Sequence, residues 1–77
     1  MLDQKDLLKK FGKYIRQNRV INEIKQEEVA EAVGITQPQY SRIESGVRRV
    51  EFDLAMKICE FIHADITEFI NDYINKE

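Results

Sequence analysis

The sequence has 77 residues, the length of one small domain, and we expect a single domain spanning residues 1–77. Its composition, 43% hydrophobic and 34% charged, is typical of a soluble folded protein and excludes a disordered chain. No apolar run approaches the roughly 20 residues that cross a bilayer, and the N-terminus lacks a signal-peptide core. A single cysteine excludes an internal disulfide. We therefore expect a cytoplasmic protein with no membrane partner.

The net charge of −2 at first argues against a nucleic-acid partner, but the charge is unevenly distributed. Residues 51–77 carry seven acidic and two basic side chains, a net of −5. Residues 37–50 carry three arginines and one glutamate, a net of +2, and residues 1–36 sum to +1. A local basic segment is sufficient for contact with phosphate groups, so the composition is compatible with DNA binding.

Apolar residues at helical spacing predict a first helix over residues 3–19, with Asp3 as its N-cap. One face of this helix is predicted to carry Leu8, Phe11, Ile15 and Arg19. Residues 20–25 form a connection, and we expect Ile21 and Ile24 to fill the edge of the core.

The segment Gln26–Ser45, QEEVAEAVGITQPQYSRIES, predicts two short helices separated by a tight turn at residues 34–36. Gly34 is small where the two helices approach each other. Thr36 and Gln39 have the spacing of a capping box, which starts the second helix. The predicted buried residues of that helix are Tyr40 and Ile43. Glutamine and arginine on its opposite face are typical of a helix that reads DNA.

Two further helices are predicted after Gly46, the expected left-handed end of the preceding helix. The first covers residues 52–62, with a buried stripe formed by Phe52, Ala55, Ile58, Cys59 and Ile62. The second covers about residues 66–75, with Asp65 and Glu68 at capping-box spacing. Its apolar side chains are Ile66, Phe69, Ile70, Tyr73 and Ile74. This stripe is longer than a small core needs, so we expect part of it to face another subunit.

Enzymatic and metal-binding chemistry find no support in the sequence. The one histidine, His63, has only Cys59 at ligand spacing, and that cysteine belongs to the predicted apolar stripe. The carboxylates of Glu27, Glu28 and Glu31 form a solvated helix face without a histidine partner. We therefore expect no enzyme activity, no metal and no cofactor.

Four segments, GKYIRQNR, QEEVAEAVGITQPQYSRIESG, LAMKICEFI and DITEFI, carry a resemblance to a known family. They resemble the Cro and phage-repressor (XRE-like) helix-turn-helix DNA-binding family over about residues 11–70. The resemblance implies an all-α, compact five-helix domain of the lambda-repressor type, whose third helix enters the major groove of DNA.

The resemblance also implies roles for individual residues. It implies base contacts by Gln37, Pro38, Ser41 and Arg42. It implies phosphate contacts by Gln26, Gln39, Ser45, Arg48 and Arg49. Arg19 and Glu44 match a structural ion pair, buried between the first and third helices. The chemistry agrees, because an amide such as Gln37 pairs with adenine and a guanidinium such as Arg42 pairs with guanine.

The sequence departs from the family pattern in its loops. Glu23 and His63 stand where the family prefers glycine, Lys25 stands where it prefers a serine or threonine cap, and Val50 replaces a common proline. These differences fall outside the predicted reading face, so they bear on loop geometry.

The expected function is that of a transcriptional regulator, acting as a repressor and as a homodimer on a palindromic operator in double-stranded DNA. The predicted dimer interface consists of Phe69, Tyr73 and Ile74, with some of the N-terminal leucines. We expect no small-molecule ligand. The alternative is a protein-interaction module on the same scaffold, such as an antitoxin, for which DNA binding is secondary. Salt dependence of binding separates the two, because phosphate-driven association weakens steeply with salt.

Overall fold

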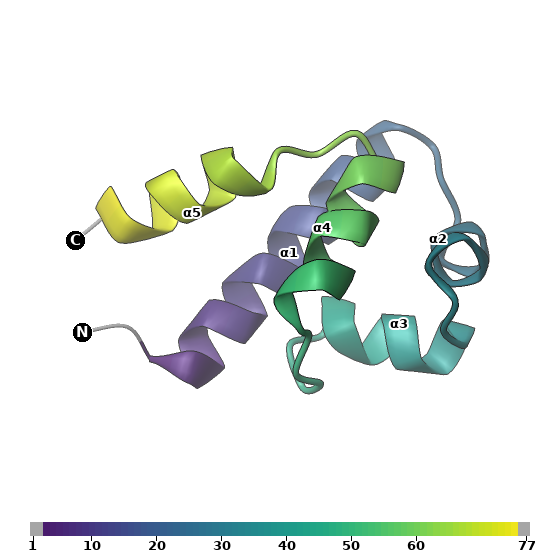
Figure 1. Ribbon diagram of the computed structural model, residues 1–77, viewed down its shortest axis with the longest axis horizontal. Coiled ribbons are helices and arrows are strands. Elements are labelled where there is room, and N and C mark those ends of the chain that lie inside the picture. The colour runs from purple at the N-terminus through teal and green to yellow at the C-terminus, as the bar shows by residue number, and fades with distance from the viewer. Residues whose placement is uncertain (1–2, 76–77) are drawn as a thin grey trace.

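A computed structural model describes residues 3–75 of the chain. Within this range the protein consists of five α-helices and contains no strand (Figure 1). The helices are α1 (Gln4–Ile21), α2 (Gln26–Val33), α3 (Gln37–Glu44), α4 (Phe52–Phe61) and α5 (Ile66–Asn75). The predicted all-α, five-helix architecture is therefore confirmed.

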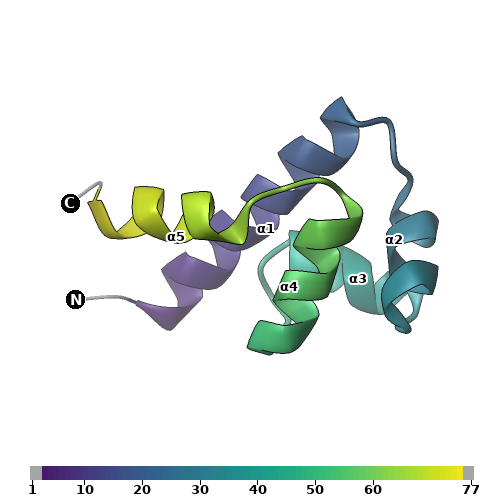
Figure 2. The ribbon, with the colours of Figure 1, turned by 45° about the horizontal axis from the view of Figure 1, so that its top comes forward.

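Helix α1 is the longest of the five and packs against α3 on one part of its length and against α5 on another (Figures 1 and 2). Helix α3 packs against both α2 and α1, α4 packs against α2, and α5 contacts both α1 and α4. The molecule measures 34 × 22 × 19 Å along its principal axes. The α2–α3 pair and the free end of α5 lie at opposite ends of the longest axis, with α4 between them (Figure 1).

A single apolar core joins all five helices. Its buried hydrophobic residues are Phe11, Ile15, Val29, Ala30, Tyr40, Ile43, Ala55, Ile58, Cys59, Ile62 and Phe69. The ring of Phe69 meets the edge of Phe11 at a centroid distance of 5.4 Å and lies 5.3 Å from the ring of Tyr14. Such aromatic pairs add to the free energy of burial, and here they attach α5 to α1.

Two apolar side chains predicted to be buried are exposed. Phe52 is 65% exposed, because it is the first residue of α4 and lies beyond the end of the core. Ile21 is 75% exposed, because α1 continues two residues further than the predicted end at residue 19 and turns this side chain toward solvent. Ile24 packs against the core as expected.

The helix starts follow the predicted capping chemistry, with one exception. Asp3 accepts a hydrogen bond from the amide of Lys5, and Thr36 Oγ1 accepts one from the amide of Gln39. Gln39 Oε1 in turn accepts from the amide of Thr36 at 2.9 Å, which completes the capping box. The exception is the box predicted at Asp65.

Asp65 Oδ1 does accept hydrogen bonds from the amides of Thr67 and Glu68. The Glu68 side chain, however, does not return to the cap, because its Oε1 accepts a hydrogen bond from the Tyr14 hydroxyl at 3.0 Å. This contact uses Glu68 to hold α5 against α1.

Two glycines have different structural roles, one at the C-terminal end of α2 and one inside α1. Gly34 ends α2 with φ of +84°, and nothing lies within 4 Å of where its Cβ would be. The expectation that Gly34 is needed for close helix approach is therefore wrong, and its backbone conformation is the reason for glycine. The close approach occurs at Gly12, where a Cβ would overlap the carbonyl oxygen of Glu44 and lie 2.6 Å from that of Ile43.

Glu23 and His63 occupy left-handed backbone positions, with φ of 59° and 62°. They are two of the positions at which the family resemblance calls for glycine. A side chain in this conformation is strained because its Cβ approaches the backbone carbonyl oxygen. The loops after α1 and α4 thus keep the turn that glycine would allow, at a cost in free energy.

Replacing Glu23 or His63 with glycine is expected to stabilise the protein by about 1 kcal/mol each, because glycine removes the strain of positive φ. The measurement is urea denaturation followed by circular dichroism. Glu31→Gly, a change on the exposed face of α2, is the control and should lower stability by about 1 kcal/mol. Equal losses for Glu23→Gly and Glu31→Gly would contradict the strain assigned to position 23.

Candidate nucleic-acid interface

The side of α3 that faces away from the core carries the side chains to which the family resemblance gave base contacts. Pro38 and Arg42 are exposed, and Gln37 and Ser41 are half-buried. Tyr40 and Ile43 lie on the opposite side of the helix and are fully buried, so they fix how α3 is rotated. The arrangement leaves a short polar surface at the end of the molecule formed by α2 and α3.

A chain of hydrogen bonds connects this surface to the interior. Glu44 Oε1 accepts from Gln26 Nε2 at 2.9 Å, and Gln26 Oε1 accepts from Gln37 Nε2 at 2.7 Å. A carboxylate only accepts, so Gln26 must direct its amide nitrogen inward and its oxygen toward Gln37. Gln37 therefore keeps its own oxygen and one N–H for a ligand, which is the pair that adenine N6 and N7 require.

The inner end of this chain is the ion pair between Arg19 and Glu44. Arg19 Nε donates to Glu44 Oε2 at 2.6 Å, and its Nη2 donates to Oε1 at 3.2 Å. The two side chains are 12% and 4% exposed, and Arg19 Nη1 also donates to the carbonyl of Ile24. Such a bidentate pair joins α1, the α1–α2 loop and α3 in one fixed geometry. The structure thus contains the Arg19–Glu44 contact that the resemblance implied.

The surroundings of Glu44 determine its ionisation. Burial raises its pKa, but hydrogen bonds from Arg19 and Gln26 and the adjacent hydroxyl of Tyr40 outweigh that effect, so the pKa is lowered from 4.5. The hydrogen bond to Glu44 likewise raises the pKa of Arg19. Burial, followed by the Glu44 carboxylate, raises the pKa of Tyr40, whose hydroxyl lacks the geometry of a full hydrogen bond. All three groups therefore keep their usual charge at neutral pH.

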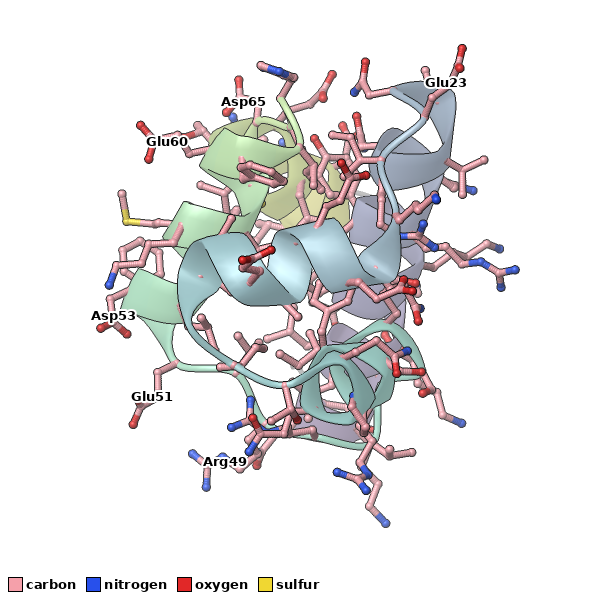
Figure 3. All side chains as sticks on the ribbon, turned by 90° about the vertical axis from the view of Figure 1, so that its right-hand side faces the viewer. Glu23, Arg49, Glu51, Asp53, Glu60 and Asp65 are labelled. Carbon is pink, nitrogen blue, oxygen red and sulfur yellow. The ribbon has the colours of Figure 1, made fainter. Side chains whose placement is uncertain are left out.

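The residues assigned to phosphate contact differ in how accessible they are. Arg49 is exposed and projects from the α3–α4 loop at the lower edge of Figure 3. Arg48 is half-buried, and its Nη1 is buried without a hydrogen-bond partner in the described part of the chain. Ser45 Oγ donates to the carbonyl of Ser41, and Gln39 Oε1 is held by its cap. Arg49 is thus the better placed of the two arginines for a phosphate.

The sequence analysis did not identify one basic residue that lies near this surface, Lys9. The backbone of Lys9 lies against Gly46, so close that a Cβ on the glycine would be 2.7 Å from its Cα. The exposed Lys9 side chain therefore starts beside the loop that carries Arg48 and Arg49. No local sequence signal places Lys9 there, because the contact depends on the packing of α1 against the end of α3.

The residues predicted to form a dimer interface are mostly used within the chain. Phe69 is 8% exposed and belongs to the core, which corrects its assignment to an intersubunit surface. Tyr73 stacks on Phe69 and donates a hydrogen bond to Asp6 Oδ2 at 3.0 Å. Ile74 remains 49% exposed. Phe69 and Tyr73 thus attach α5 to α1, whereas Ile70 and Ile74 on the same helix stay exposed.

The described residues contain neither a cluster of metal ligands nor a membrane-spanning helix. Between residues 3 and 75 no three histidine, cysteine or acidic side chains gather as metal ligands. No helix in that range has both the length and the apolar character needed to cross a membrane. The polar surface of α2 and α3 is the feature that remains to be explained.

Comparison with known proteins shows the family of this chain. Residues 15–69 match the sequence model of a helix-turn-helix family. The chain is also 36% identical over 64 residues to the uncharacterized HTH-type transcriptional regulator YqaF of Bacillus subtilis (strain 168), covering 83% of this chain and 84% of that protein. The protein therefore belongs to the helix-turn-helix family of DNA-binding transcriptional regulators, in its Cro and phage-repressor (XRE-like) branch.

Solved structures share the fold. The clp gene regulator ClgR from Corynebacterium glutamicum superposes with a TM-score of 0.80 at 23% identity, over 86% of this chain and 70% of that one. The restriction-modification controller protein C.Esp1396I superposes with a TM-score of 0.74 at 22% identity, over 88% and 90% of the two chains. At this level of identity the likeness supports the five-helix fold alone.

Proposed function

We propose that this protein is a repressor that recognises a specific operator by placing α3 in the major groove. The observation that carries the proposal is the hydrogen-bond chain from Glu44 through Gln26 to Gln37. A half-buried amide held in one orientation is suited to base recognition, because recognition requires a fixed order of donor and acceptor. Membership of the regulator family supports the same function.

The roles of the remaining residues follow from their chemistry and position. Arg42 is exposed one helical turn beyond Pro38 and supplies a planar donor pair for guanine O6 and N7. Pro38 has no side-chain donor and offers apolar contact, such as to a thymine methyl group. Arg49 and Lys9 supply positive charge for the phosphate backbone, which positions the helix without reading sequence.

We further propose that the protein acts as a homodimer on a palindromic operator. One α3 helix contacts only a few base pairs, which is too little to select a site in a genome. Two copies related by a two-fold axis read two half-sites about one turn of DNA apart. Dimerisation also doubles the number of phosphate contacts, which raises the affinity of a chain this small.

Replacing Gln37 or Arg42 with alanine is expected to cost on the order of 1–3 kcal/mol per half-site on the preferred operator and to relax the preference at particular base pairs. The measurement is binding to a panel of duplexes that each differ from the selected operator at one position. An unchanged preference in Arg42→Ala would contradict its place on the reading face.

Arg49→Ala is the matched control, since it removes the same type of side chain from the adjacent loop. It should weaken binding to all duplexes about equally and lower the magnitude of the salt slope by about 1 per protomer, because a phosphate contact carries no sequence information. A change confined to one base pair would instead place Arg49 in the groove.

A further inference from the structure

A strip of apolar side chains, three of them exposed and one half-buried, runs along α4 and onto α5. Phe52 and Met56, four residues apart on one face of α4, are 65% and 47% exposed. Met56 and Ile66 line the same groove between α4 and the start of α5, and Ile70 follows one turn later with 37% exposure. We call these four residues the α4 strip. Single exposed apolar residues are ordinary, but a contiguous row of them is typical of an interaction surface.

The charges beside the α4 strip indicate that DNA does not cover it. Asp53, Glu60 and Asp65 project from the left and upper left of the view in Figure 3, and Arg49 projects from its lower edge. Asp53, Glu60 and Asp65 also border the groove that contains Met56. Carboxylates repel the phosphate backbone, so the strip and the reading surface serve different partners.

The same charges are suited to a second copy of this chain. Lys57 borders the groove together with Asp53, so the strip carries both signs of charge close to its apolar centre. In a two-fold interface a residue i of one copy meets j of the other, and j meets i. Asp53 of each protomer is thus able to pair with Lys57 of the other while the apolar residues meet between them.

The dimensions of the molecule separate this surface from the free end of α5. That end and the α2–α3 pair lie at opposite ends of the 34 Å axis (Figure 1). A two-fold axis beyond Ile74 would hold the two reading helices apart by nearly twice the molecular length. An axis beside α4, which lies between those ends, holds the two reading helices closer together than an axis beyond Ile74 does, and half-sites one turn apart are separated by only about 34 Å.

We propose that two copies of the protein associate through the α4 strip, with Phe52 and Met56 at the centre of the interface. The proposal rests on the function proposed above, because the spacing requirement comes from paired half-sites. It replaces the interface predicted around Phe69, Tyr73 and Ile74.

The first test is the self-association of Phe52→Asp, measured by sedimentation equilibrium. The dissociation constant of the dimer is expected to rise at least about 30-fold, because a charge replaces a central apolar contact. Ile21→Asp is the control: Ile21 is 75% exposed at the end of α1 and does not line the groove that contains Met56 and Ile66. Equal effects of the two variants, or a wild-type protein that is monomeric both free and on operator DNA, would overturn the proposal. Circular dichroism checks that each variant is folded.

The second test locates the axis directly by cross-linking. The Cys59→Ala background removes the natural thiol, and Met56→Cys and Ile74→Cys each add one thiol for a short bismaleimide. Covalent dimers are expected for Met56→Cys and not for Ile74→Cys, since only residues near a two-fold axis approach their own copies. The reverse result would overturn the proposal and place the interface on α5.

A duplex with a single half-site separates failure of this inference from failure of the proposed function. Wild type and Phe52→Asp should bind it with equal affinity, while only wild type gains from a second half-site. If wild type binds no duplex, the function is wrong. If both proteins gain equally from the second half-site, the function stands and the α4 strip is not the interface.

Discussion

Replacing Glu44 with alanine is expected to lower the free energy of unfolding by about 3–5 kcal/mol, because it leaves the buried guanidinium of Arg19 without its partner. The Glu44 side chain is only 4% exposed and accepts hydrogen bonds from both Arg19 and Gln26. Small domains have only about 5–15 kcal/mol of stability, so the variant should be close to unfolding at 37 °C. Urea denaturation of wild type and variant provides the measurement.

Two control variants separate the buried charge from the loss of an acid in general. Glu31→Ala removes an exposed glutamate from α2 and should change stability by less than about 0.5 kcal/mol. The double variant Arg19→Met/Glu44→Leu removes both charges and should recover most of the loss, because no buried charge remains unpaired. A loss in the double variant as large as in Glu44→Ala would contradict this explanation.

The pH dependence of stability provides an independent check on the same pair. The pKa of Glu44 is lowered in the folded protein, so its contribution is fully present above the unfolded value of 4.5. That contribution is lost as the pH falls through the folded pKa. Wild type should therefore lose more stability than Arg19→Met/Glu44→Leu as the pH is lowered below 4.5.

The second large effect is expected for Gly12→Ala, which should destabilise the protein by about 1–3 kcal/mol. Inside a helix this substitution ordinarily stabilises by up to about 1 kcal/mol, so the sign of the effect tests the contact itself. The added methyl group would overlap the carbonyl oxygens of Ile43 and Glu44, which are backbone atoms at the end of α3. Helix α1 must then move away from α3 and strain the Arg19–Glu44 pair.

Lys13→Ala is the matched control, since Lys13 is the exposed neighbour on the same helix. It should change the urea midpoint little, whereas Gly12→Ala should lower it. If Gly12→Ala raised the midpoint instead, α1 and α3 would have to be farther apart than the structure places them.

The sequence predicted the helix-turn-helix well because local chemistry determines it. Thr36 and Gln39 form the expected capping box, and Tyr40 and Ile43 are buried at the expected spacing. Gly46 has the expected positive φ. In each case the structural cause lies within a few residues along the chain.

The errors arose where distant segments meet. Whether Phe52 is buried depends on how far the core extends past the start of α4, and the periodicity of that helix does not contain this information. In the sequence Gly12 is an ordinary helical residue, and only the structure places the carbonyl oxygens of α3 beside it. Phe69 has the spacing of an interface residue, but the rings of Phe11 and Tyr14 enclose it.

At the candidate site, too, the sequence identified the individual residues but not the contacts between them. The sequence and its family resemblance named Gln26, Gln37 and Glu44 separately. The structure adds that their side chains form one continuous hydrogen-bond chain, which gives the amide of Gln37 a defined direction. That connection depends on the packing of α2 against α3, and no single segment predicts it.

Sequence-specific recognition by α3 is tested by selecting bound duplexes from random DNA with the wild-type protein at two salt concentrations. We expect enrichment of an inverted repeat with half-sites about one helical turn apart, and an affinity that falls steeply as the salt concentration rises. A selected pool that stays as random as the starting pool, with binding insensitive to salt, would contradict sequence-specific recognition by α3.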